Sequence, residues 1–191
     1  MSNRVVVGVT GATGQVFGSA ALKLLADRDG VETHLVLSEA AKVTIRHESD
    51  DALSELRGLA DTVYDNGNIG APVASGSFET LGMLVAPCSM KTLSNIAHGH
   101  AGDLITRAAD VTLKERRPLV VMPREKPYNR IHLENMLAAT DAGAVVFPPL
   151  LSFYQEADSL EAMVERTVER AVGHLDVETN YDEWSGVTDG S

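Results

Sequence analysis

The chain has 191 residues, of which 44% are hydrophobic and 23% charged, which suits one globular domain that buries its own core. Its net charge of −11 argues against nucleic-acid backbones and anionic membranes as partners. One cysteine excludes an intrachain disulfide framework. Since no secretory signal and no membrane-spanning apolar stretch occurs, a cytoplasmic location is expected.

The charged residues are unevenly divided, with 27 acidic against 16 basic side chains. Five of the basic residues are lysines. Many carboxylates with few lysines fit a surface hydrated for high salt, and they also fit an ordinary acidic protein. The scarce basic residues are therefore most informative where they cluster.

Short β-branched or apolar runs alternate with helical patterns along the chain. The predicted strands cover residues 4–10, 33–38, 62–65, 81–87, 118–123 and 143–149. The predicted helices follow Gly14 as far as Leu25 and cover residues 39–48, 50–59, 90–98, 102–115, 129–141 and 158–175. Residues 66–77 are rich in glycine, proline and serine, so they are expected to form a long loop.

This alternation predicts a doubly wound α/β fold, a mostly parallel sheet with helices on both faces. Residues 1–176 form the predicted domain, and residues 177–191 a polar, acidic tail. Ligands of such sheets bind at the carboxyl ends of the strands, so the residues that follow each strand are the candidates for a site.

The sequence GVTGATGQVFG follows the first predicted strand. Gly11, Gly14 and Gly18 lie three and four residues apart, which is not the dinucleotide fingerprint G-x-G-x-x-G. Small residues before a helix N-terminus admit an anionic, nucleotide-type cofactor, but they also fit a merely tight turn. The hydroxyl of Thr13 suits a ligand or a helix cap equally.

Two polar residues flank the next helix. Ser38 ends the second strand, where its hydroxyl either faces the same crevice or caps the helix that begins at Glu39. Glu48 follows that helix with ordinary surface spacing, and the pattern alone favours a solvated carboxylate.

Cys88 opens the segment Cys88–Lys91 at the end of the fourth strand. A nucleophilic cysteine needs a base or a strong positive field, and nothing in the sequence places His98 or His100 beside the sulfur. A packed, unreactive thiol is the favoured interpretation. Zinc is not expected, because the single cysteine and scattered histidines lack ligand spacing.

Basic residues gather near the next strand. Arg107 and Lys114 lie seven apart, on one face of a predicted helix. Arg124 and Glu125, followed by Lys126, come directly after the strand. Charges at a strand's carboxyl end suit an anionic ligand with a carboxylate beside it, although a surface turn has the same composition.

Taken together, several segments resemble the UbiX-type flavin prenyltransferases (the UbiX/Pad1 family), from about residue 4 to about residue 175. The segments are GVTGATG, THLVLSEAAKVTIRHE, ASGSFETLGMLVAPCSMKTLSNIAHG, LITRAADVTLKERRPLVVMPRE, HLENMLAATDAGAVVFPP and the FY of LSFYQ. The resemblance implies a flavodoxin-like or Rossmann-like three-layer fold, FMN as the bound flavin, and assembly as a homododecamer.

The resemblance also implies an activity. Such enzymes join the dimethylallyl group of dimethylallyl phosphate to N5 and C6 of reduced FMN without a metal, and the prenylated FMN serves a UbiD-type decarboxylase, as in ubiquinone biosynthesis. A flavin-dependent cysteine decarboxylase of the same superfamily and a non-catalytic FMN carrier are the alternatives, but neither needs a cluster that binds a prenyl phosphate.

The family's functional residues carry over by position. Flavin contacts fall on Gly11, Ala12, Thr13, Ser38, Cys88, Ser89, Met90, Lys91 and Arg124. Prenyl-phosphate contacts fall on Lys114, Arg124, Tyr154 and Arg170, with Arg107 and Trp184 nearby. The catalytic candidates are Glu48, Glu125 and Thr13, where relatives commonly have serine. Which glutamate moves which proton stays open.

Overall fold

Six strands form one parallel sheet in the order β3-β2-β1-β4-β5-β6. The computed structural model describes residues 3–48, 52–153, 159–179 and 181. The predicted doubly wound α/β fold is confirmed, and its strand order is that of the Rossmann type of sheet. The strands are β1 Arg4–Val9, β2 Glu32–Leu37, β3 Thr62–Asp65, β4 Gly82–Cys88, β5 Leu119–Pro123 and β6 Val145–Val146.

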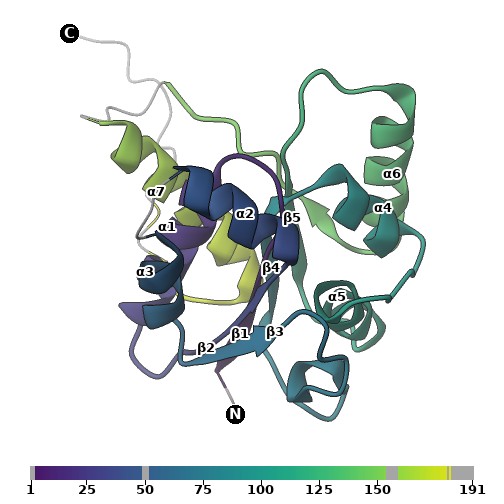
Figure 1. The fold of residues 1–191 in the computed structure, drawn as a ribbon, viewed down its shortest axis with the longest axis horizontal. Coiled ribbons are helices and arrows are strands. Elements are labelled where there is room, and N and C mark those ends of the chain that lie inside the picture. The colour runs from purple at the N-terminus through teal and green to yellow at the C-terminus, as the bar shows by residue number, and fades with distance from the viewer. Residues whose placement is uncertain (1–2, 49–51, 154–158, 180, 182–191) are drawn as a thin grey trace, which may run out of the picture.

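Helices connect the strands and cover both faces of the sheet (Figure 1). They are α1 Gln15–Ala26, α2 Glu39–Glu48, α3 Ala52–Gly58, α4 Met90–Ala97, α5 Leu104–Lys114, α6 Arg130–Asp141 and α7 Leu160–Val172, with 3-10 turns η1 Pro72–Ala74 and η2 Gly173–Leu175. At α2, α4, α5, α6 and α7, the side chain of the residue before the helix accepts a first-turn amide and so fixes the start of the helix. No helix within the described ranges is long and apolar enough to cross a membrane.

Successive residues of the central strands point into two separate cores. Val5 and Val7 of β1 pack in a core with α1 and α7, while Val6 packs in a core with α4, α5 and α6. This division follows from the two-residue period of a strand that is buried on both faces. It places α7 and α5 on opposite faces of the sheet.

Three of the differences from the predicted boundaries lie at the C-terminal end of the fold. The last strand is confined to Val145–Val146, and Pro148 and Pro149, which lack an N–H, stand just beyond it. The last helix ends at Val172 and continues as η2. Val177, the first residue of the predicted tail, is buried and belongs to the core that contains α7.

Candidate functional site

The order of the sheet reverses between β1 and β4. Sheets of this type bind their ligands in a crevice outside the carboxyl ends of the two strands at this point. Thr10 joins the two sides of this crevice. Its N–H and its hydroxyl donate to the Pro87 carbonyl at 3.2 and 2.8 Å, and the Ser89 N–H donates to the Thr10 Oγ1 at 2.7 Å. The glycine turn after β1 and the loop after β4 are thus held together by one side chain.

Each of the three glycines after β1 has a steric or conformational reason. A Cβ on Gly11 would lie 2.3 Å from the Ala40 Cβ on α2, and a Cβ on Gly18 would lie 2.6 Å from the Ala86 carbonyl oxygen on β4. Gly14 has a φ of +91°, which favours glycine. Helix packing at Gly11 and Gly18, and backbone conformation at Gly14, are each a sufficient reason for glycine at that position.

The turn nevertheless keeps donors for a ligand. Among the described residues, the N–H groups of Gly11 and Thr13 donate to no carbonyl or side chain. Thr13 is exposed at the mouth of the turn. Free amides beside a helix N-terminus are what an anionic or carbonyl-bearing cofactor needs, so the turn fits a nucleotide-type group.

Glu48 reaches the start of α1 from the end of α2. Its two carboxylate oxygens accept the N–H groups of Gly14 and Gln15, each at 3.0 Å. The side chain is exposed, as the surface pattern indicates, but it is also fixed on a helix N-terminus, where a negative charge is favoured. Glu48 therefore belongs to the crevice.

Ser38 caps α2. Its Oγ accepts the Ala41 N–H at 3.1 Å, which confirms the capping interpretation. A hydroxyl that accepts one bond still carries its own O–H, so capping does not exclude a second contact with a ligand.

Cys88 is completely buried, and burial raises the pKa of its thiol to about 12. The residue is therefore a neutral, packed thiol at physiological pH, as the sequence interpretation favoured, and not a nucleophile. Its contribution to the site comes through the backbone, because its carbonyl accepts the Arg124 N–H at 3.0 Å. Ser89 then caps α4 by accepting the Thr92 N–H, and the amides of Met90 and Lys91 form the first turn of that helix.

Arg124 and Glu125 follow β5 at the same edge. Arg124 is half-buried beside Cys88, and Glu125 is exposed, with its Oε1 accepting the Lys126 N–H at 3.0 Å. The carboxyl ends of β1, β4 and β5 thus bring two helix N-termini and Arg124 to one crevice. Glu48, at the start of α1, adds a carboxylate there.

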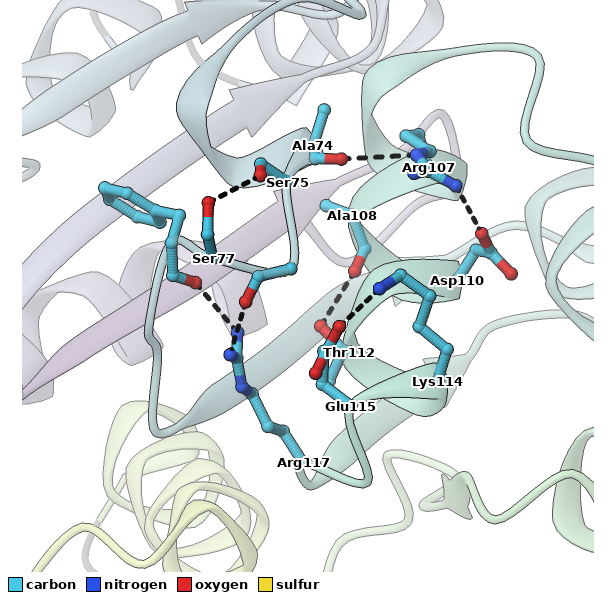
Figure 2. A network of polar contacts seen from close by, with 12 residues as sticks. Ala74, Ser75, Ser77, Arg107, Ala108, Asp110, Thr112, Lys114, Glu115 and Arg117 are labelled. Atoms are coloured by element: carbon cyan, nitrogen blue, oxygen red, sulfur yellow. Dashed lines mark hydrogen bonds and ion pairs between the residues drawn. The ribbon is translucent and has the colours of Figure 1, made fainter.

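Two predicted basic residues lie elsewhere, on α5 (Figure 2). Arg107 donates to the Ala74 carbonyl at 3.2 Å and pairs with Asp110 at 2.7 Å. Lys114 ends α5 and pairs with Glu115, ahead of the start of β5. The five residues of β5 span roughly 16 Å, and Lys114 lies ahead of this strand while Arg124 lies just after it, at the opposite edge of the sheet.

Arg170 lies on α7, on the other face of the sheet from α5. Its guanidinium carbon is 6.0 Å from the centre of the Tyr181 ring, and it lines a small cavity of about 30 Å³ with Arg166 and Thr167. The predicted contacts Tyr154 and Trp184 lie outside the described residues. One chain therefore does not bring Arg170, Lys114 and Arg124 together.

Two residues that sequence reasoning missed organise the crevice, Thr10 and Gln15. Thr10 is the last residue of the predicted apolar strand and was treated as part of that strand. Gln15 lies in the segment GVTGATGQVFG, which was interpreted from its small residues alone. A usable signal existed for Gln15, because a long amide at the first position of a helix is positioned to reach back to the preceding turn.

A Rossmann-type sheet whose switch point presents two helix N-termini, small residues and an arginine defines a protein that binds a nucleotide-type cofactor.

Comparison with known proteins narrows this class. Residues 1–172 match the family described as Flavoprotein. The flavin prenyltransferase UbiX of Neisseria meningitidis serogroup B is 47% identical over 190 residues, 99% of this chain and 100% of the relative. A crystal structure of AnUbiX with FMN and dimethylallyl pyrophosphate has a TM-score of 0.92 at 48% identity and covers 98% of this chain and 100% of the other. A crystal structure of a dodecameric FMN-dependent UbiX-like decarboxylase from Escherichia coli O157:H7 has a TM-score of 0.91 at 44% identity and covers 96% of this chain and 100% of the other. The chain belongs to the flavoprotein family and, within it, to the UbiX-type flavin prenyltransferases.

Proposed function

We propose that this protein transfers the dimethylallyl group of dimethylallyl phosphate to N5 and C6 of reduced FMN. The observation that carries the proposal is the nearly full-length similarity to UbiX proteins, one of them in complex with FMN and dimethylallyl pyrophosphate. The geometry of the crevice supports it, because the donors there suit a flavin nucleotide.

The flavin would be held at the switch point between β1 and β4. The open amides of Gly11 and Thr13, the first turn of α4, and Arg124 are the groups that would hold it. Reduced flavin supplies a nucleophilic nitrogen and a second attachment point on its aromatic ring. Cys88 is fully buried beneath this loop, so its neutral thiol would take no part in bond formation.

Breaking the allylic C–O bond leaves negative charge on the phosphate, which Arg124, Lys114, Arg170 and the Tyr154 hydroxyl would stabilise in place of a metal. Lys114 precedes β5 and Arg124 follows it, so the two cations of one chain lie at opposite edges of the sheet. We therefore propose that neighbouring copies complete the phosphate site. The dodecameric assembly of the Escherichia coli relative supports this arrangement.

The two glutamates occupy different positions. Glu48 is fixed by two backbone amides beside the glycine turn, where the flavin would lie. Glu125 is exposed next to Arg124, on the proposed phosphate side, and is the better candidate to protonate the departing phosphate. If Glu125→Gln kept the wild-type single-turnover rate, this role would be excluded.

The product would serve a UbiD-type decarboxylase in the cytoplasm, with ubiquinone biosynthesis as one pathway. A high net negative charge supports function at high salt, where such a surface stays hydrated.

An anaerobic incubation tests the proposal. The purified protein is mixed with reduced FMN and dimethylallyl phosphate, without added metal, at low and at high salt. The mass of the flavin released from the protein is then measured by mass spectrometry. A flavin heavier by one prenyl unit is the expected product. Unchanged FMN at both salt concentrations, with tight flavin binding intact, would contradict the transferase and favour an FMN carrier or a cysteine decarboxylase.

A further inference from the structure

We propose that Gln15 is a positioning residue for the flavin, because its side-chain amide fixes the shape of the turn from Thr10 to Gly14. The proposal rests on the flavin site of the proposed function, but it concerns a residue that contacts the turn and not the reacting atoms.

The Gln15 side chain is 5% exposed and reaches back under the turn that precedes it. Its Nε2 donates to the Thr10 carbonyl at 3.0 Å and to the Ala12 carbonyl at 2.6 Å. An amide nitrogen has two N–H donors, so both are used, and two carbonyl acceptors also fix which end of the amide faces the turn. These bonds orient the Thr10–Gly11 and Ala12–Thr13 peptide groups, which carry the open N–H groups of Gly11 and Thr13.

The same residue is linked to the other parts of the crevice. The backbone N–H of Gln15 donates to the Glu48 carboxylate. The side chain of Gln15 donates to the Thr10 carbonyl, and the Thr10 hydroxyl in turn accepts the Ser89 N–H across the crevice. Gln15 therefore connects the glycine turn, the loop after β4 and the acidic residue at the end of α2. A change in the Gln15 side chain should therefore alter the positions of the groups that would surround the flavin.

The side-chain oxygen of Gln15 supports the same role. Among the residues that the structure describes, no donor reaches the buried Gln15 Oε1. A buried, unbonded oxygen is unfavourable, and methionine would fill the same space without it. An amide at this position is therefore best explained by the two bonds that its nitrogen donates to the turn.

The test compares Gln15→Met with wild type. Methionine keeps the length and volume of the side chain and removes both donors. A matched control is Thr112→Val, which removes a buried hydroxyl that donates to the Ala108 carbonyl within α5, away from the crevice (Figure 2). For each protein, the Kd for FMN is measured by quenching of flavin fluorescence, the absorption spectrum of bound FMN is recorded at saturation, and the urea midpoint of the apoprotein is determined.

Gln15→Met is expected to raise the Kd for FMN about tenfold, because binding must then order a turn that the two hydrogen bonds no longer hold, and to shift the absorption bands of bound FMN. Thr112→Val is expected to lower the urea midpoint without either change. A Kd within twofold of wild type and an unshifted spectrum for Gln15→Met would overturn the proposal, since a residue with a purely structural role lowers stability alone.

If Gln15→Met fails to fold, Gln15→Ala, which leaves room for water at the two carbonyls, takes its place with the same expected loss of affinity. Failure of both variants to fold beside a folded Thr112→Val would assign Gln15 to folding and overturn the proposal. Failure of the transferase is distinguishable, because wild type would then bind FMN and yet release it unprenylated.

Discussion

Replacing Gly11 by alanine should force α2 away from the turn after β1. The added Cβ would lie 2.3 Å from the Ala40 Cβ, 3.0 Å from the Ala40 carbonyl carbon and 3.2 Å from its Cα. Carbon atoms normally pack at about 3.5–4.0 Å. Because two of these neighbours are backbone atoms, the overlap cannot be relieved by a rotamer change, and a cost of about 3 kcal/mol in the free energy of unfolding is expected, the upper end for overpacking.

The assay is a double-mutant cycle with Ala40→Gly, followed by urea unfolding at a single protein concentration. Ala40→Gly alone should cost up to about 1 kcal/mol, as glycine does in a helix. In the double variant the shortest contact is gone while the backbone contact at 3.0 Å remains. The two changes should therefore be coupled by about 1.5 kcal/mol or more, with part of the lost stability regained.

The Kd for FMN in the same proteins then separates the two explanations of Gly11. Affinity that recovers together with stability means that the glycine serves helix packing. Affinity that stays lost in the double variant means that the missing Cβ makes room for the ligand. The steric reasoning itself is refuted if Gly11→Ala costs less than about 0.5 kcal/mol or if the two changes are additive within that margin.

Three further predictions concern the rest of the chain. Arg117→Met removes two hydrogen bonds of 2.8 Å to loop carbonyls and should lower the free energy of unfolding by about 2–4 kcal/mol, whereas Arg116→Met, at an exposed side chain, should change it by less than about 0.5 kcal/mol. Burial lowers the pKa of the His34 imidazole, so the unfolded chain takes up the proton first and stability should fall as the pH drops below about 6.5. The free energy of unfolding should fall by at most about 1.4 kcal/mol per pH unit. If the free energy of unfolding of His34→Phe fell equally steeply with pH, the contribution of His34 would be contradicted. Cys88 should not react with Ellman's reagent at pH 8 in the folded protein and should react fully in denaturant, and rapid labelling of the folded protein would show that the thiol is accessible.

The elements of the fold were predictable because their signals are local. The helix over residues 39–48 was predicted with the bounds that the structure has, and the other helices and strands within a few residues. Apolar periodicity decides these assignments, and it needs no knowledge of distant residues. The strand predicted over 143–149 was the exception, since an apolar run that leads into two prolines looks longer than the part that pairs.

The crevice was predictable only in part, because its bonds join residues that are far apart in the sequence. Glu48 lies 34 residues from Gly14, and Thr10 lies 79 residues from Ser89. Surface spacing along α2 says nothing about where the end of that helix points. The resemblance to a family named Glu48 as a site residue, but only the fold supplies the physical reason, a carboxylate on a helix N-terminus.

The basic residues show how closeness in sequence misleads in an α/β fold. Lys114 and Arg124 are ten residues apart, yet a helix that precedes a parallel strand ends at the amino edge of the sheet and the strand ends at the opposite edge. Two cations of one phosphate site can therefore come from one short segment only if they belong to different chains.

Co-assembly of two inactive variants tests this conclusion. Lys114→Ala and Arg124→Ala should each abolish prenyl transfer, because each removes a charge that stabilises the departing phosphate. When the two chains are expressed together with different tags and the mixed oligomer is isolated, a site that takes its lysine and its arginine from different copies is intact in about one case in four, so about a quarter of wild-type activity should return. The two variants, mixed after separate assembly, serve as the control and should stay inactive. If the mixed oligomer is as inactive as its parents, both residues act within one chain, and the relation between α5 and the carboxyl edge of the sheet must change in the active protein.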